Sequence, residues 1–381
     1  MLPPACEGRP PMPLFDGITT RVIETPRLAV GILEREGDDP ATPGERTVIL
    51  VHGNVSSSLF WQEIMQDLPS DLRVIAVDLR GFGYTEHAPV DATRGLRDFS
   101  DDLFATLEAL EIETAHLVGW SMGGGVVMQY ALEHPVLSLT LQAPVSPYGF
   151  GGTRRDGSRL TDDDAGCGGG GANPDFVERL AAGDASADAQ TSPRNVFRSG
   201  YVSTAYSSEH EDTWVESMLS TSTAEGNYPG DGVPSENWPG FAAGTIGVLN
   251  TMAPRHHDVS GIVGLDVKPP VLWIHGTVDA IVSDTSFYDL NYLGKLGIVP
   301  GWPGDEVAPP QEMVSQTRDV LDAYTAAGGQ VTEVELEGVG HSPHLERPAE
   351  FRQALLRHIG YVGTPTGTAP ATEAIILKSA D

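Results

Sequence analysis

The sequence is poor in cysteine, and it has no long apolar run. Its 381 residues include two cysteines, Cys6 and Cys167, both in irregular stretches. One bridge between them stays open, but a disulfide framework is excluded. No stretch approaches the roughly 18 apolar residues that a membrane-spanning helix needs. The Pro-rich residues 1–15 do not read as a signal peptide. We therefore expect a cytoplasmic protein without membrane contact.

Positive charge is also scarce. Lysine and arginine number 23, against 53 aspartates and glutamates, which gives a formal net charge of −30. Only three basic residues are lysines, namely Lys268, Lys295 and Lys378. A surface this acidic repels phosphate backbones, so nucleic-acid binding is excluded as a function. A salt-rich habitat and a GC-rich genome both explain the composition, and both explanations stay open.

What the chain does contain is an alternation of buried strands and helices. Continuous apolar runs, typical of strands buried on both faces, lie at residues 47–51, 73–77, 115–118, 138–143 and 271–274, with an alternating strand at 331–336. Helical spacing is found at residues 60–68, 96–110, 126–133, 311–327 and 351–359. This alternation predicts an α/β fold with a mostly parallel, twisted sheet and helices on both faces. Two short patches at 21–24 and 27–33 predict an antiparallel hairpin that turns at Thr25 and Pro26.

A change in amino-acid composition also divides the chain into parts. After Pro147 it becomes Gly-rich and acidic, and then consists of helix-compatible pieces broken by Gly and Pro. We predict a mainly helical cap inserted in the core. The predicted parts are an N-terminal arm (1–17), a core (18–146 and 266–360), a cap insertion (147–265), a second insertion near the active site (283–310) and a C-terminal tail (361–381).

The best-defined motif is Gly-Trp-Ser-Met-Gly at residues 119–123, between a predicted strand and a predicted helix. A strand that turns this sharply into a helix forces its central residue, Ser121, into a strained conformation with an exposed side chain. Gly119 and Gly123 lack the Cβ atoms that would collide across the turn. The motif alone is weak evidence in a chain with 44 glycines. Its context predicts a nucleophile elbow.

Two other predicted strands end in residues that complete a nucleophilic site. Asp279 and His341 follow the strands at 271–274 and 331–336. Because the carboxyl ends of parallel strands share one edge, both side chains are expected near Ser121. A serine needs a base to remove its proton, and a carboxylate fixes the tautomer of that base. Asp284 and Asp266 compete with Asp279, and His344 competes with His341; position directly after the strand favours Asp279 and His341.

Over residues 21–359 the chain resembles the α/β-hydrolase superfamily, in particular esterase-like and lactonase-like serine hydrolases with an inserted cap. The resemblance is carried, in order, by residues 52–54 (HGN), 78–83 (DLRGFG), 119–124 (GWSMGG), 275–279 (HGTVD) and 340–341 (GH). It implies that Ser121 is the nucleophile, His341 the base and Asp279 the acid. It also implies an oxyanion hole formed by the backbone N–H groups of Asn54 and Met122. The two insertions depart from a minimal member and are expected to cover and select the substrate.

The remaining polar motifs are interpreted as structural. His52 and His275 are expected to pack beneath loops, and Asp78 and Arg80 to tie loops together. The neighbouring His256 and His257 point to different sides, so no metal site is predicted there. The acidic run at 162–164 is interpreted as a solvated loop.

The aromatic residues of the cap allow two interpretations. They form either a small core of the insertion or an apolar pocket over the elbow. In the second case the candidate pocket residues are Trp120, Trp214, Met218 and Phe241.

The predicted function is hydrolysis of a carboxylic ester or lactone, a small and apolar molecule, through an acyl-enzyme. No cofactor is expected. Carbon–carbon bond hydrolases, cofactor-free perhydrolases and aminopeptidases share a serine triad in this family and stay open. So does a non-catalytic protein of this fold that only binds a ligand. The sequence leaves the oligomeric state open.

Overall fold

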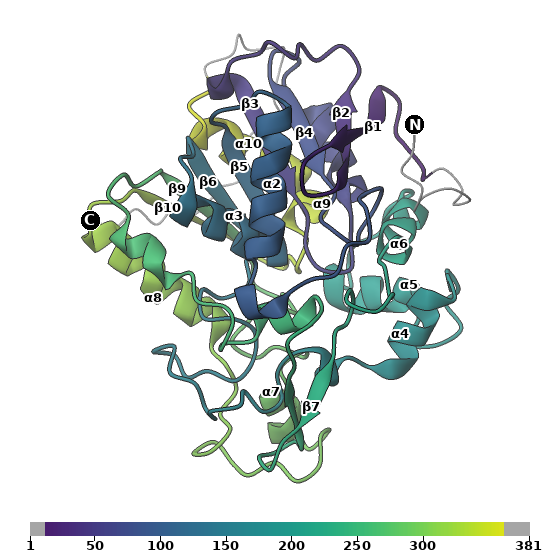
Figure 1. Ribbon diagram of the computed structural model, residues 1–381, viewed down its shortest axis with the longest axis vertical. Helices are drawn as coiled ribbons and strands as arrows, with labels where there is room; N and C mark the ends of the chain where they lie inside the picture. Colours follow the sequence, from purple (N-terminus) through teal and green to yellow (C-terminus); the bar gives the residue numbers. More distant parts are fainter. Residues whose placement is uncertain (1–11, 362–381) are drawn as a thin grey trace.

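The computed structural model describes residues 12–361, and its centre is an eight-stranded sheet (Figure 1). The strand order is β1-β2-β4-β3-β5-β6-β9-β10; the pairs β1–β2 and β2–β4 are antiparallel, and all the other pairs are parallel. This confirms the predicted fold class and the N-terminal hairpin. The strands are β1 (Ile18–Glu24), β2 (Ala29–Arg35), β3 (Thr47–Val51), β4 (Arg73–Val77), β5 (His116–Trp120), β6 (Ser138–Gln142), β9 (Val271–Gly276) and β10 (Val331–Leu336).

Helices cover both faces of the sheet (Figure 1). On one face α2 (Arg97–Ala109) packs against α3 (Met122–Glu133), and on the other α1 (Gln62–Asp67) packs against α10 (Pro348–His358). The helix α8 (Met313–Ala326) precedes β10, and the short α9 (Pro343–Glu346) follows it. In α2 the side chains of Phe99, Leu103 and Leu107 are buried on one stripe, as their spacing predicts. The parallel strands all end at the same edge of this sheet, whose two faces are covered by helices.

The long segment between β6 and β9 adds no strand to this sheet and lies below it in Figure 1. Its regular structure is mostly short helices, joined by long irregular stretches in which Gly and Pro interrupt helical hydrogen bonding. The elements are α4 (Pro174–Ala181), α5 (Pro193–Val196), a π-helical turn (Phe197–Tyr201), α6 (Glu211–Leu219) and the two-stranded ribbon of β7 (Gly232–Pro234) and β8 (Phe241–Ala243). We call residues 147–265 the cap segment.

The loop at residues 78–92, which follows β4, forms the seam between the core and the cap segment. Backbone N–H groups bond across it in both directions, from Ser222 to Gly81 O (2.8 Å), from Val90 to Gly226 O (2.9 Å) and from Gly247 to Val90 O (3.0 Å). Main-chain pairing of this kind holds two segments at fixed register. Besides its two covalent connections to the core, the cap segment is thus joined to it by backbone hydrogen bonds along the seam loop.

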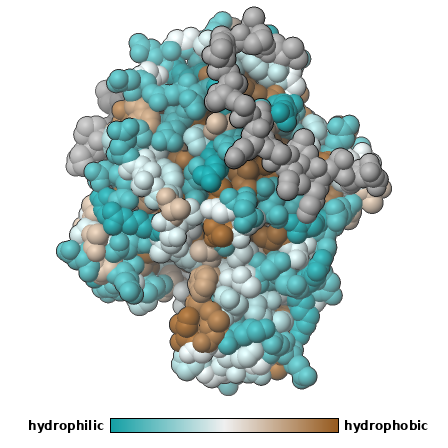
Figure 2. Space-filling view, turned by 180° about the vertical axis from the view of Figure 1, so that it is seen from behind, coloured by the Kyte–Doolittle hydropathy of each residue, from teal (hydrophilic) through white to brown (hydrophobic). Residues whose placement is uncertain are grey.

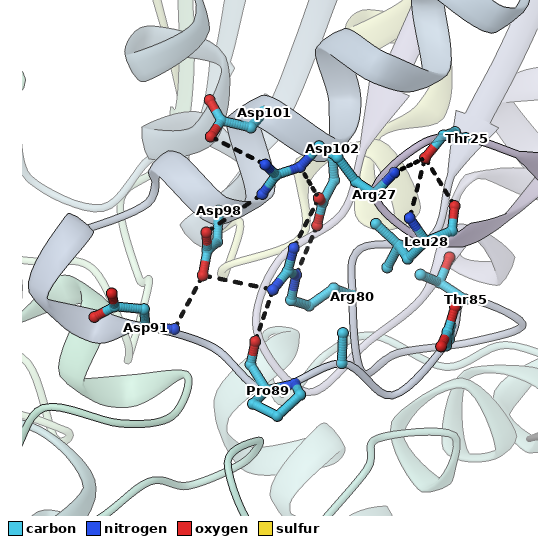
Figure 3. Close-up of polar contacts among 12 residues, drawn as sticks. Thr25, Arg27, Leu28, Arg80, Thr85, Pro89, Asp91, Asp98, Asp101 and Asp102 are labelled. Carbon is cyan, nitrogen blue, oxygen red and sulfur yellow. Dashed lines mark hydrogen bonds and ion pairs between the residues drawn. The ribbon is translucent and has the colours of Figure 1, made fainter.

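A buried ion network fixes the seam loop from the core side (Figure 3). Arg80 donates two hydrogen bonds to the Asp102 carboxylate of α2 (2.7 and 2.8 Å) and a third to Pro89 O (2.6 Å). Arg27 donates to the same Asp102 (2.6 Å), and Asp98 accepts from the Asp91 N–H (2.9 Å). Paired, multiply bonded charges of this kind are costly to break inside a protein. Arg80 therefore ties loops together, as predicted.

Residues 283–310, predicted to be a second insertion, pack against the cap segment. Gly294, in α7 (Leu290–Lys295), lies between the rings of Trp302 and Trp238, and the Trp238 indole donates to Pro300 O (2.9 Å). The segment also leaves apolar side chains exposed, including Phe287 (55%), Ile298 (63%) and Val307 (55%). Apolar surface is visible at the end of the molecule that carries α7 (Figure 2).

The described part of the predicted arm packs against the folded chain, and Cys167 lies inside it. The Phe15 N–H donates to the Gln62 side chain (2.7 Å), and the Phe15 ring lies 4.3 Å from the His210 ring. Cys167 is buried. Cys6, most of the predicted arm and residues 362–381 of the predicted tail lie outside the described residues. Within residues 12–361, no helix combines the length and the apolar character needed to cross a bilayer.

Burial of His257 makes stability depend on pH. Desolvation lowers the pKa of this imidazole from 6.5 to about 4, although the Asp258 charge acts in the opposite direction. The unfolded chain therefore binds a proton below pH 6.5 that the folded chain does not, and stability falls as the pH drops towards 4. We expect His257→Gln to reduce the loss of unfolding free energy between pH 7 and pH 5 by about 2 kcal/mol.

Urea unfolding of both proteins at the two pH values measures this difference. Each protein is compared with its own value at pH 7, so any general cost of the substitution cancels. Equal losses in the two proteins would show that His257 does not carry the effect.

Candidate active site

The structure places Ser121 on a strained turn between β5 and α3. Its backbone has φ 57° and ψ −121°, a conformation that non-glycine residues rarely adopt. A Cβ atom at Gly119 would collide with the Gly123 carbonyl, and one at Gly123 would collide with the His52 carbonyl. Both glycines are therefore required by close approach of the backbone, as the motif predicts. The Ser121 side chain is half-buried.

The loop after β3 (residues 52–57, called here the β3 loop) lies directly against this serine. A Cβ atom on Gly53 would lie 2.8 Å from the Ser121 Cβ and 3.4 Å from its Oγ. Asn54 follows on the chain, and Met122 is the first residue of α3, so its N–H has no partner within the helix. Of the two residues predicted for the oxyanion hole, Met122 thus follows Ser121 directly, and Asn54 follows the glycine that packs against it.

His341 and Asp279 form a buried pair at the same edge of the sheet. The His341 Nδ1 lies 2.8 Å from Asp279 Oδ2, and both side chains are 1% exposed. The other oxygen, Oδ1, accepts from the Ile281 N–H (2.7 Å) and the Val282 N–H (3.0 Å). Because an ionised carboxylate only accepts hydrogen bonds, Nδ1 carries the proton and Nε2 stays available as a base.

The competing residues have other partners. Asp284 accepts from the N–H groups of Val314 (2.9 Å) and Ser315 (3.0 Å) in the first turn of α8. His344 accepts at Nδ1 from the Gln142 side chain (2.7 Å), and burial lowers its pKa to about 3. Both observations favour Asp279 and His341 over these alternatives.

Trp120 lies beneath the site and does not line an open pocket. Its side chain is 0% exposed, and its indole N–H donates to His341 O (2.8 Å). The Phe60 ring lies 4.9 Å from Trp120 and 5.4 Å from Trp214, so these rings join the cap segment to the core. A completely buried ring offers no surface to a substrate in this conformation.

The other candidate pocket residues are also packed away. Met218, like Trp214, is 0% exposed in α6. Phe241 of β8 packs on Gly170 and Gly171 within the cap segment. Of the two interpretations of the cap aromatics, packing is the one that these contacts support. Composition shows that residues are apolar, but it does not show which apolar cluster they join.

His52 and Asp78 support the loops around Ser121. The His52 Nδ1 donates to Gly53 O (2.7 Å), and Nε2 accepts from the Leu79 N–H (2.9 Å). Burial lowers the pKa of His52 to about 4, so this imidazole stays neutral. Asp78 accepts from the Ser58 and Tyr84 N–H groups (2.7 and 2.8 Å), and burial raises its pKa to about 6. Neither residue contacts Ser121 through these bonds.

Among residues 12–361, one cluster has three side chains that could hold a metal, namely His275, Glu333 and Glu335. Glu333 already accepts from His275 (2.9 Å) and from Arg318 (2.5 Å). Arg318 also lies 3.7 Å from Glu335, so a guanidinium already neutralises both carboxylates. His275, Glu333 and Glu335 thus form an ion-pair network with Arg318.

Two residues near the site were not singled out from the sequence. The Tyr201 hydroxyl donates to Asn54 O (2.8 Å). Glu346 accepts from the Gly340 N–H (2.8 Å) and from the Ser203 N–H (3.0 Å) of the cap segment. Tyr201 is one of many aromatic residues in the cap segment, and Glu346 is one of many acidic residues. No local pattern distinguishes either of them.

Curated relatives match only part of the chain. A 2-hydroxymuconate semialdehyde hydrolase of Pseudomonas sp. (strain CF600) is 41% identical over 91 residues, which are 23% of this chain and 32% of that protein. A pimeloyl-[acyl-carrier protein] methyl ester esterase of Aliivibrio salmonicida (strain LFI1238) is 38% identical over 95 residues, which are 25% and 34% of the two chains. The matched region thus spans about a third of each relative.

Solved structures extend the likeness to most of the fold. An esterase from Exiguobacterium antarcticum superposes with a TM-score of 0.54 and 15% identity, covering 90% of this chain and 100% of the other. The family model described as alpha/beta hydrolase fold matches residues 46–303, which is more than half of the chain. The chain therefore belongs to the alpha/beta hydrolase fold family.

Proposed function

We propose that the protein is a serine hydrolase that cleaves a carboxylic ester or lactone through an acyl-enzyme. The observation that carries this proposal is the buried hydrogen bond between His341 Nδ1 and Asp279 Oδ2 (2.8 Å), at the sheet edge where Ser121 lies on its strained turn. A base that is oriented by a carboxylate at the same sheet edge as a serine is the arrangement that activates a hydroxyl group.

In the proposed reaction, His341 Nε2 takes the proton of Ser121 as Oγ attacks the substrate carbonyl carbon. The N–H groups of Asn54 and Met122 stabilise the oxyanion that develops, typically by about 3 kcal/mol each. The imidazolium then protonates the leaving alkoxide, and the carbon–oxygen bond breaks. Water, deprotonated by the same imidazole, attacks the acyl-enzyme. The bond between the acyl carbon and Ser121 Oγ breaks, the imidazolium returns its proton to Oγ, and the acid is released. Asp279 stays ionised and stabilises the imidazolium in both steps.

A second candidate is hydrolysis of a carbon–carbon bond. It is favoured by the 41% identity of a 91-residue region to a 2-hydroxymuconate semialdehyde hydrolase. The same three side chains serve both reactions, and the bond cleaved depends on which substrate the insertions admit. The ester proposal ranks first because an ester leaves as an alkoxide that the His341 imidazolium can protonate, whereas carbon–carbon cleavage also needs a substrate that stabilises a carbanion.

A substrate panel distinguishes the two candidates. Purified protein is assayed with p-nitrophenyl esters of acyl chains from two to twelve carbons, a series of γ- and δ-lactones, and a vinylogous 1,5-diketone. We expect kcat/KM to be at least tenfold higher for an ester or lactone than for the diketone. The reverse order would replace the ester proposal by carbon–carbon hydrolysis. Absence of turnover on every member would contradict both proposals.

A further inference from the structure

The cap segment places the Tyr201 hydroxyl group on the β3 loop. Tyr201 is the last residue of the π-helical turn, and its side chain is buried against the core. Its hydroxyl donates to Asn54 O (2.8 Å), and Val55 O lies 3.3 Å away. A hydroxyl has one proton, so the shorter contact carries the hydrogen bond. π-Helical turns are rare and are frequently found at functional sites.

The peptide that Tyr201 holds is strained. Val55 has φ 46°, a left-handed conformation that is unfavourable for a β-branched side chain. Such a residue persists only where its surroundings impose it. The Tyr201 hydroxyl contacts the carbonyl groups of both Asn54 and Val55, so it acts on either side of the strained residue. The Asn54 N–H belongs to the preceding Gly53–Asn54 peptide, whose carbonyl accepts from His52 (2.7 Å). The Tyr201 hydrogen bond therefore acts on this N–H through the Asn54 backbone, which joins the two peptides.

The same stretch of the cap segment reaches the other half of the site. The Tyr201 ring lies 6.1 Å from the His341 ring in an edge-on arrangement. Two residues later, the Ser203 N–H donates to Glu346 Oε2 (3.0 Å), while Glu346 Oε1 accepts from the Gly340 N–H (2.8 Å), next to His341. In addition, Ser217 of α6 shares a hydrogen bond with Ser57 of the β3 loop (2.6 Å).

We propose that Tyr201 is a positioning residue that orients the Asn54 N–H for the transition state through its hydrogen bond to the β3 loop. The cap segment thereby completes the oxyanion hole as well as covering the site. This inference rests on the proposed function, because the oxyanion hole has a role only in acyl-transfer chemistry of this kind. The hydroxyl is expected to contribute to kcat and not to KM, since it supports a group that binds charge developing in the transition state.

The variant Tyr201→Phe removes the hydroxyl and keeps the ring. Tyr324→Phe is the matched control, since the Tyr324 hydroxyl is also buried and donates to a backbone carbonyl, Pro269 O (2.6 Å), in the core. We expect Tyr201→Phe to lower kcat by about tenfold with KM within twofold of wild type, whereas Tyr324→Phe keeps wild-type kcat. Urea unfolding of both variants reports the general cost of a lost buried hydrogen bond.

A second readout separates this proposal from the question of substrate. A fluorophosphonate forms a bond between phosphorus and Ser121 Oγ as fluoride leaves, and the phosphoryl oxygen occupies the oxyanion hole. The rate of this labelling, followed by intact mass, is expected to fall about tenfold in Tyr201→Phe. A protein that is labelled but cleaves no ester would contradict the ester proposal and leave the comparison of variants valid. Labelling of Tyr201→Phe at the wild-type rate would overturn the positioning role.

Discussion

Replacing Ser121 by alanine is expected to lower kcat for the best ester of the panel on the order of 10⁶-fold. The methyl group has no lone pair to attack the carbonyl carbon, so the acyl-enzyme cannot form. The residual rate would come from substrate binding and the oxyanion hole acting on water. Initial rates with enzyme-saturating ester, together with intact mass after fluorophosphonate treatment, measure both the loss of turnover and the loss of the labelled residue.

Ser260→Ala provides the control for this substitution. Ser260 lies in the cap segment, and its hydroxyl donates to Asp258 (2.6 Å). The Ser260→Ala variant should be labelled by the fluorophosphonate and turn over substrate like the wild type. Equal activity of Ser121→Ala and the wild type would show that another group performs the chemistry. In that case a non-catalytic role for this motif, including simple ligand binding, would gain support.

The substitution Asp279→Asn is expected to lower kcat by about 10⁴-fold while the protein stays folded. The N–H groups of Ile281 and Val282 both donate to one oxygen of this side chain. The asparagine therefore keeps its carbonyl oxygen there and directs its NH₂ group towards His341 Nδ1. The imidazole must then accept at Nδ1 and carry its proton on Nε2, the nitrogen that has to accept the Ser121 proton.

The matched control is Asp284→Asn, a change of the same kind in the aspartate that competes with Asp279 in the sequence. Asp284 bonds to the first turn of α8, so its loss should lower the urea midpoint slightly and leave kcat within twofold. Steady-state kinetics of both variants decides between the two carboxylates. A large loss of kcat in Asp284→Asn with an active Asp279→Asn would reverse the assignment.

The strands and the Ser121 turn were predictable because they depend on local chemistry. The continuous apolar run at 47–51 can be satisfied only by burial on both faces, and β3 covers those residues. The turn at Ser121 is encoded by two glycines that no other residue can replace without a clash. The order of the strands then brings the loops that carry Asp279 and His341 to one edge.

The contacts of the cap segment were not predictable in the same way. Trp214 and Met218 satisfy an apolar environment equally well in a pocket wall and in a packed interface, and the structure places them in the interface. Tyr201 contacts Asn54, 147 residues earlier in the chain. A hydrogen bond of that separation leaves no periodicity, spacing or composition by which a single sequence would reveal it.

The seam loop has a consequence for building chimaeras within this family. Residues 78–92 belong to the core by position in the chain, yet their backbone pairs with residues 222–247 of the cap segment. A crossover placed only at the two ends of the cap segment would separate backbone segments that pair with each other in this structure. A graft that moves residues 78–92 with the cap segment keeps those pairings, but it also has to carry Asp98 and Asp102 of α2, the anchors of Arg80. The unit of exchange is therefore discontinuous in sequence and larger than the insertion itself.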